Sequence, residues 1–137
     1  KKAVDIFGSQ AIVASVDYKL IDERYRMFDH VRRCLYKRGL MDHINSLLLS
    51  GVGELVLSSV DADGELDGYD LGILDALSDL PIPILINGGC GIPAHMEQAF
   101  KERISGCCAG SVFYFTEYGY RDIKEHLLDS GLNIRRP

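Results

Sequence analysis

The stretch Ile86-Asn87-Gly88-Gly89-Cys90-Gly91-Ile92-Pro93 decides how this chain is interpreted. It follows the apolar run 82–86 and precedes a segment with helical spacing. Two glycines between a strand and a helix leave backbone N–H groups without a Cβ to shield them, which suits an anion, most often a phosphate. A Gly-Gly turn by itself is more often only a tight connection, so the neighbouring segments must support the phosphate interpretation.

The apolar runs on either side of this stretch predict a regular alternation of strands and helices. Strands are expected at 11–16, 54–60, 84–86 and 106–109, and helices at 42–50, 69–80, 94–103, 112–115 and 121–129. Asp42 is expected to cap the first helix, Pro81 to end the second, and Pro93 to occupy the first turn of the third. Leucines at 71, 74 and 77 are expected to face inward. Residues 18–40 are charged and aromatic, and a long loop, a hairpin and the start of a helix all remain open.

Four strand–helix units in succession imply a parallel sheet with right-handed crossovers. Two architectures fit: a (βα)4 half-barrel, which would resemble strands 5–8 of a (β/α)8 TIM barrel, and an open doubly wound sheet. Both place ligands at the carboxyl ends of the strands. In barrels the phosphate site commonly lies in the loops after strands seven and eight, beside a short helix. Gly88-Gly89, Gly110-Ser111 and the segment 112–115 match this description.

Two carboxylates at these strand ends are candidates for chemistry. Asp17 follows the first strand, and alternation places it on the same face as Val13 and Ser15. A carboxylate in a partly dry mouth can act as a general acid or base; the alternative is a loop-anchoring Asp. Asp63 precedes Gly64 in an acidic turn and is expected either to orient a substrate group or merely to form the turn.

The bulk composition favours one ordinary domain spanning residues 1–137. The chain is 47% hydrophobic and carries a net charge of −5, and its acidic residues are spread out, which argues against a nucleic-acid partner. No apolar run is long enough for a membrane helix, so no membrane association is expected. The four cysteines lack zinc-ligand spacing, and the four histidines form no metal motif. We expect a cytoplasmic protein with reduced, mostly buried cysteines, surface histidines, no metal and no cofactor.

With these residues placed, the chain closely resembles the C-terminal half of the cyclase subunit of imidazole glycerol phosphate synthase, an enzyme of histidine biosynthesis. The resemblance covers roughly half of the chain, in the family's order and spacing. The matching stretches are FGSQAIVASVDYK (7–19), GVGELVLSSVDADGELDGYD (51–70), INGGCG (86–91) and AGSVFYFTEYGYRDIKEHLLDSGLNIR (109–135).

The resemblance implies a fold, a reaction and a set of site residues. The family is a (β/α)8 barrel that cyclises an aminoimidazole-carboxamide ribonucleotide derivative with ammonia from a partner glutaminase, releasing a ribonucleotide in a lyase-type step. By resemblance, Asp17 lies on the family's catalytic aspartate of strand five. Gln10 and Glu54 lie at the N-terminal mouth, where ammonia enters in the family. The resemblance assigns binding of one substrate phosphate to Asp63, Gly64, Gly88, Gly89, Gly110 and Ser111.

Several features depart from the family. Its first half has no counterpart in this sequence, and this half carries the second catalytic aspartate and the other phosphate site. Segment 25–40 does not resemble the family's loop, Ala62 stands where arginine is usual, and Glu65 replaces a typical threonine. Because a full barrel takes about 250 residues, we expect two halves to close it, most simply as a homodimer. Two alternatives are a truncated homologue acting as a non-catalytic phosphate-binding module, and an amidotransferase-linked protein of surface-sugar biosynthesis.

Overall fold

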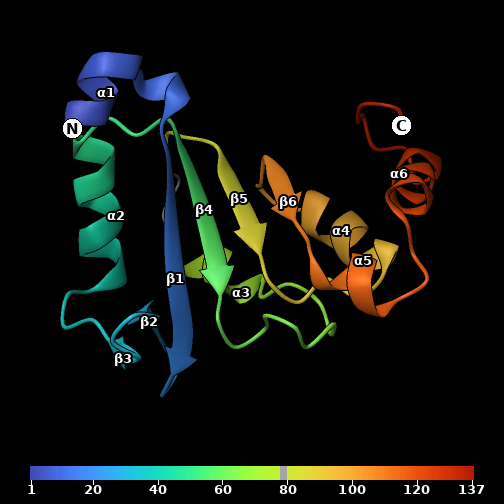
Figure 1. The fold of residues 1–137 in the computed structure, drawn as a ribbon, viewed down its shortest axis with the longest axis horizontal. Helices are drawn as coiled ribbons and strands as arrows, with labels where there is room; N and C mark the ends of the chain where they lie inside the picture. The colour runs from blue at the N-terminus through green and yellow to red at the C-terminus, as the bar shows by residue number, and fades with distance from the viewer. Residues whose placement is uncertain (78–79) are drawn as a thin grey trace.

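The computed structural model describes residues 1–77 and 80–137, and a six-stranded sheet in the order β3-β2-β1-β4-β5-β6 forms its centre. Four strands pair in parallel, with their arrowheads toward one end of the molecule in Figure 1. These four are β1 (Val13–Ile21), β4 (Glu54–Ser59), β5 (Ile84–Asn87) and β6 (Gly106–Cys108). The antiparallel pair β2 (Arg24–Asp29) and β3 (Cys34–Leu35) extends the sheet beside β1.

Helical segments connect the parallel strands. The short helix α1 (Lys2–Phe7) and the 3-10 turn η1 (Ser9–Ala11) lie at the N-terminal ends of the strands, opposite the arrowheads (Figure 1). The other helices are α2 (Leu40–Leu49), α3 (Gly72–Ala76), α4 (Pro93–Phe100), α5 (Ser111–Phe115) and α6 (Tyr120–Asp129). The predicted alternation of strands and helices is therefore confirmed, and Pro93 does occupy the first position of α4.

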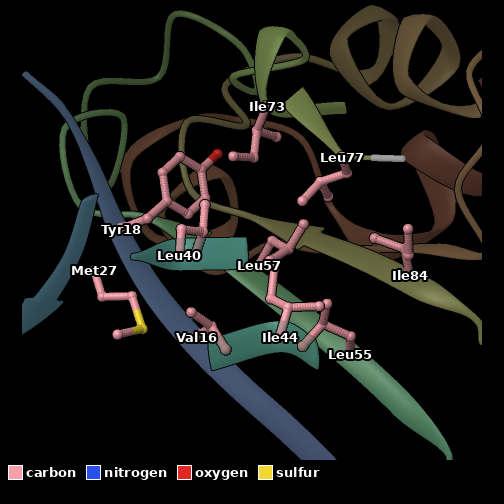
Figure 2. Packing of buried hydrophobic residues seen from close by; sticks show 10 residues of the cluster. All are labelled: Val16, Tyr18, Met27, Leu40, Ile44, Leu55, Leu57, Ile73, Leu77 and Ile84. Carbon is pink, nitrogen blue, oxygen red and sulfur yellow. The ribbon is translucent and has the colours of Figure 1, made fainter. Parts of the chain in front are cut away.

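One face of the sheet carries the core. Alternate side chains of the parallel strands pack against Leu40 and Ile44 of α2 and Ile73 of α3 (Figure 2). The strand residues in this cluster include Val16, Tyr18, Leu55, Leu57 and Ile84. A second cluster joins Met96 of α4 to residues of α5 and α6 and includes Cys107 of β6. Burying each large aliphatic side chain contributes roughly 1.5–3 kcal/mol, so this covered face holds the sheet to its helices.

The other face of the parallel strands is open. Val13 is 50% exposed, Ser15 is exposed, and Asp17 and Val56 are only half-buried, although each alternates with a core residue. Cys107 lies in register with buried Ile86, so the second cluster packs on the same face as the first. In a doubly wound sheet helices would cover both faces. Among the described residues they cover one, so the fold is the (βα)4 half-barrel.

The segment left undecided by the sequence is a β-hairpin. Strand β1 was expected to end before Asp17. It instead continues to Ile21 and pairs antiparallel with β2. Asp22 and Glu23 form the two-residue turn between the paired residues Ile21 and Arg24, with φ values of 48° and 58°. Such turns favour Asn-Gly or Asp-Gly, so this hairpin carries no typical turn signal.

Helices α2 and α3 begin or end where the sequence did not place them. Helix α2 is capped by Gly39, and Asp42 lies in its first turn rather than at the N-cap. Helix α3 has five residues instead of the expected span 69–80, and Ile73 is its one buried residue. Leu77 is buried just beyond the helix end, Leu71 and Leu74 are only partly buried, and residues 78–79 fall outside the described residues.

Tertiary contacts explain the late start of α3. The Tyr69 hydroxyl donates to the Cys108 carbonyl at 3.0 Å, and the Tyr25 hydroxyl donates to Asp70 Oδ1 at 3.1 Å. These hydrogen bonds hold the loop before α3 against β6 and the hairpin, so residues 69–70 stay outside the helix. Helix α4 also ends early, at Phe100 instead of 103.

The hairpin turn generates a stability prediction. Asp22 and Glu23 both have a left-handed backbone conformation, which costs free energy and which Asn and Gly adopt more readily. The double change Asp22→Asn/Glu23→Gly should raise the free energy of unfolding by about 1 kcal/mol in urea titrations. The control Glu125→Gly, within helix α6, should lower it by about 1 kcal/mol because glycine disfavours a helix interior. Destabilisation by the double change would contradict the turn assignment.

The contact between α4 and α6 generates a pH prediction. The pKa of Glu97 is lowered to about 2, first by the hydrogen bond from Lys101 (2.7 Å) and then by Ser130 and His126 (2.9 Å). Because the folded pKa lies below the ordinary value of 4.5, the stabilisation is present above pH 4.5 and is lost as pH falls toward 2. Glu97→Gln should flatten this part of a stability profile measured by urea unfolding. An unchanged slope would contradict the contact.

Candidate functional site

Four polar side chains lie in one row across the open face. The parallel register aligns Asp17 with Ser58, Ser58 with Asn87, and Asn87 with Cys108. Neighbours in such a row are about 4.8 Å apart, and Asn87 Nδ2 donates to Ser58 Oγ at 3.3 Å. A carboxylate, a hydroxyl, an amide and a thiol thus line the carboxyl end of the sheet. Ser58 and Cys108 were not singled out from the sequence as site residues, because the register between strands is what aligns them with Asn87.

A small cavity adjoins this row where β5 and β6 end. Five of the six predicted phosphate-binding residues line it: Asp63, Gly88, Gly89, Gly110 and Ser111. They come from three separate loops. The sixth residue, Gly64, belongs to the same acidic turn as Asp63 and has a φ of 86°, but it is not among the lining residues.

The glycines of this cavity meet different constraints. Gly88 and Gly89 both have a φ of 97°, and a Cβ at Gly88 would lie 2.7 Å from the Ser59 carbonyl oxygen. A Cβ at Gly89 would collide with the Gly68 carbonyl group. The N–H of Gly68 donates to the Gly89 carbonyl at 2.8 Å. The fold itself therefore demands both glycines. At Gly110, φ is −133° and a Cβ would meet nothing within 4 Å.

The acidic loop after β4 is tied down at its first residue. Asp61 pairs with Lys19 at 2.6 Å and accepts the Leu20 N–H at 3.0 Å. The hydrogen bond from Lys19 is the main cause that lowers the pKa of Asp61. Ser59 Oγ accepts the Ala62 N–H at 3.2 Å. These contacts anchor the turn to β1 and β4 and place Asp63 at the cavity.

Asp17 occupies β1 near the hairpin. Its side chain is 35% exposed, and Oδ2 lies 3.5 Å from Nε2 of His30. It lines a separate cavity beside β1 together with Tyr36, Arg38 and His43. The structure thus brings Asp17 to the polar row but not into the glycine-lined cavity. His30, expected only to be a surface residue that binds no metal, is the neighbour that sequence reasoning missed.

Gln10 and Glu54 lie at the opposite end of the sheet. Glu54 begins β4 and pairs with Val13, and Gln10 belongs to the turn η1 that precedes β1. A Cβ at Gly53 would lie 3.2 Å from the Gln10 Cα, so the two segments are in close contact. These residues therefore occupy the N-terminal end of the strands, away from the polar row.

The cysteines are all free, but not all are buried. Cys90 is buried, Cys107 and Cys108 are half-buried and Cys34 is exposed, so fewer cysteines are buried than the sequence predicted. Burial raises the pKa of the Cys90 thiol and raises that of Cys107 to about 12. Neutral thiols of this kind are poor metal ligands. Among residues 1–77 and 80–137, no group of three metal-binding side chains occurs, and no helix is long and apolar enough to cross a membrane.

A half-barrel with polar residues and glycine loops at the carboxyl ends of its strands defines a protein of the (β/α)-barrel class. Comparison with known proteins identifies the family. The family model described as "Histidine biosynthesis protein" matches residues 1–119. The chain belongs to this family.

Similar proteins include three described as imidazole glycerol phosphate synthase subunit HisF. The chain is 32% identical to the protein of Methanopyrus kandleri, with 98% of this chain and 57% of that protein covered. It is 33% identical to those of Bacillus pumilus and Campylobacter concisus, again over 98% of this chain and over 55% and 53% of those proteins. The chain therefore spans about half the length of these relatives.

The two kinds of glycine generate a paired prediction. Gly89→Ala should lower the free energy of unfolding by about 2–4 kcal/mol, because its Cβ meets backbone and its φ is left-handed. Gly110→Ala should change it by no more than about 0.5 kcal/mol, since the added methyl group enters open space. Thermal or urea unfolding of both variants measures the difference. Equal destabilisation would contradict the loop packing.

Proposed function

We propose that this chain supplies the phosphate-binding and proton-transfer half of a cyclase of the imidazole glycerol phosphate synthase type. The observation that carries the proposal is the convergence of five predicted phosphate-binding residues on one cavity. These residues lie beside the strand ends that also carry Asp17. The similarity to the HisF subunits supports the same function.

In this proposal each part of the site has a chemical role. The loop glycines, with Ser111 and Asp63, hold one phosphate of a bisphosphorylated aminoimidazole-carboxamide ribonucleotide. Asp17 transfers protons during the ammonia-dependent cyclisation and the lyase step. Ammonia from a glutaminase subunit enters at the opposite mouth, beside Gln10 and Glu54. The four free cysteines support a reducing, cytoplasmic location for this step of histidine biosynthesis.

The proposal includes a second half that completes the barrel. Among the described residues, β6 has a strand partner on one side only, and residues 13–17 of β1 pair with β4 alone. Open strand edges of this kind recruit further strands. Large apolar side chains are exposed near both edges, including Val13 (50%), Val31 (95%), Tyr114 (83%) and Phe115 (74%). A second copy, with its β6 beside β1 of the first, is the simplest completion because a twofold axis satisfies both edges at once.

Sedimentation tests the assembly. At micromolar concentration the purified chain should sediment as a dimer, because the open face and both edges are then covered. Changing Val13 to Asp should shift the population toward monomer, since a charge would be buried in the closed barrel. A control Leu49→Asp, on the exposed side of α2, should not. A compact, folded monomer of the wild-type chain would contradict the assembly.

Turnover tests the chemistry. With the bisphosphorylated substrate and ammonium salts, the chain should release ribonucleotide, and Asp17→Asn should reduce the rate by roughly 10²–10⁴-fold as expected for loss of a general acid or base. The control Asp129→Asn, at the end of α6, should retain the rate. Absence of turnover in all three proteins would leave the phosphate-binding module as the function.

Inorganic phosphate tests the binding cavity independently of catalysis. Saturation at a hundredfold excess over Kd should stabilise the wild-type protein by about 2.7 kcal/mol. Gly110→Ala should weaken this stabilisation, because Gly110 lines the cavity and the added methyl group hinders the approach of the anion. Ser105→Ala, just before the start of β6, should keep it. Equal stabilisation of all three proteins would place the phosphate elsewhere.

A further inference from the structure

The hairpin β2–β3 brings a histidine to the proposed proton-transfer residue. His30 follows β2 directly, and its Nε2 lies 3.5 Å from Asp17 Oδ2. The His30 side chain is 59% exposed and that of Asp17 is 35% exposed, so the pair stands at the rim of the open face. This contact joins residues 13 positions apart through an element for which the sequence offered no specific expectation.

Strand pairing explains why His30 faces Asp17. The antiparallel register pairs Tyr18 with Met27, and both side chains are buried on the covered face. One step further, Asp17 and Phe28 therefore share the open face, and alternation brings His30 to that face as well. The rings of Phe28 and His30 pack edge to face, with centroids 5.1 Å apart. The imidazole is thus supported by an aromatic neighbour near the end of β2.

The backbone just after His30 is also fixed. The buried carboxylate of Asp29 accepts the N–H groups of Val31 and Arg32, each at 2.9 Å, and pairs with Arg32 Nη1 at 3.1 Å. The backbone hydrogen bond from Arg32 is the main cause that lowers the pKa of Asp29. His30 is therefore held between a paired strand and a turn closed by its neighbouring residue, and its position beside Asp17 is built into the hairpin.

The other charged groups near the pair have partners of their own. Lys19 Nζ is paired with Asp61 and lies 5.6 Å from the centre of the Phe28 ring. Arg32 is paired with Asp29, and Arg38 donates to the Asp42 carbonyl at 2.8 Å. Tyr36 and His43 line the cavity beside Asp17; burial, and then Arg38, lower the pKa of His43. His30 is the ionisable group that contacts the Asp17 carboxylate in the described structure.

We propose that His30 is a positioning residue for Asp17: its imidazole, held 3.5 Å from the carboxylate, orients that carboxylate for proton transfer. The proposal rests on the proposed function, because it adds a residue that positions the same proton-transfer group.

Nuclear magnetic resonance tests the pair without any need for turnover. At fixed pH, Asp17→Asn should shift the ring ¹⁵N resonances of His30 and leave those of His126 unchanged. The second histidine–carboxylate pair, His126 and Glu97 at 2.9 Å, supplies the matched control. There, Glu97→Gln should shift the His126 resonances and leave those of His30 unchanged. If Asp17→Asn does not move the His30 resonances, the proposal is overturned.

Kinetics then test the consequence. His30→Asn should lower kcat by roughly ten- to a hundredfold, the scale expected for a misplaced catalytic group, with little change in KM. His126→Asn, the same chemical change outside the site, should leave both kcat and KM unchanged. A wild-type kcat in His30→Asn would overturn the proposal.

The two measurements separate this proposal from the proposed function. If the wild-type chain shows no turnover, the proposed catalytic function fails, and the ¹⁵N comparison alone decides whether His30 and Asp17 are coupled. Shifted His30 resonances then support the positioning contact, and unshifted resonances overturn it. Thermal unfolding of His30→Asn should match that of the wild type, because the side chain is exposed, so a loss of rate cannot be attributed to unfolding.

Discussion

The register of the four parallel strands is the constraint on which the rest of the structure depends. It places Val16, Leu57, Ile86 and Cys107 on the covered face, and one residue further along each strand it aligns Asp17, Ser58, Asn87 and Cys108 on the open face. A slip of one residue would send the carboxylate into the core and the aliphatic side chains into water. The same hydrophobic pattern therefore determines both the packing of the core and the position of the polar row.

The glycine loops show how the fold and the site share residues. Gly89 permits the loop around Gly68 to pass the end of β5, and Gly88 leaves room for the Ser59 carbonyl oxygen, so both glycines meet a packing requirement even without a ligand. Gly110 answers no such requirement, because a Cβ there would enter open space. Gly110 therefore differs from Gly88 and Gly89, because no packing contact of the described residues requires a glycine there. The Gly-Gly turn contributes by fixing the three-loop arrangement around the cavity.

Local signals predicted most of the fold. Short apolar runs located the parallel strands, and Pro93 and the glycines located the helix boundaries beside the site. Tertiary contacts decided the remainder. The chain reverses direction in the hairpin at Asp22 and Glu23, whose left-handed backbone conformations are unusual for these residue types. Helix α3 is shortened because Tyr69 and Asp70, just before it, form hydrogen bonds with other elements. The same hairpin carries His30, so the undecided conformation of residues 18–40 also concealed part of the candidate site.

The open face changes in character along the strands, and this bears on what can cover it. Toward the N-terminal and central part it presents Val13, Val56 and Leu85, whereas the carboxyl end presents the polar row. Burying these apolar side chains releases free energy at roughly 25 cal/mol per Å², whereas Ser15 and Glu54 on the same part of the face must then find partners. Burying the polar row would cost free energy unless each group found a partner. A covering half is therefore expected to pack tightly over the centre of the sheet and leave its carboxyl end accessible, which is the geometry of a barrel with a ligand at its mouth.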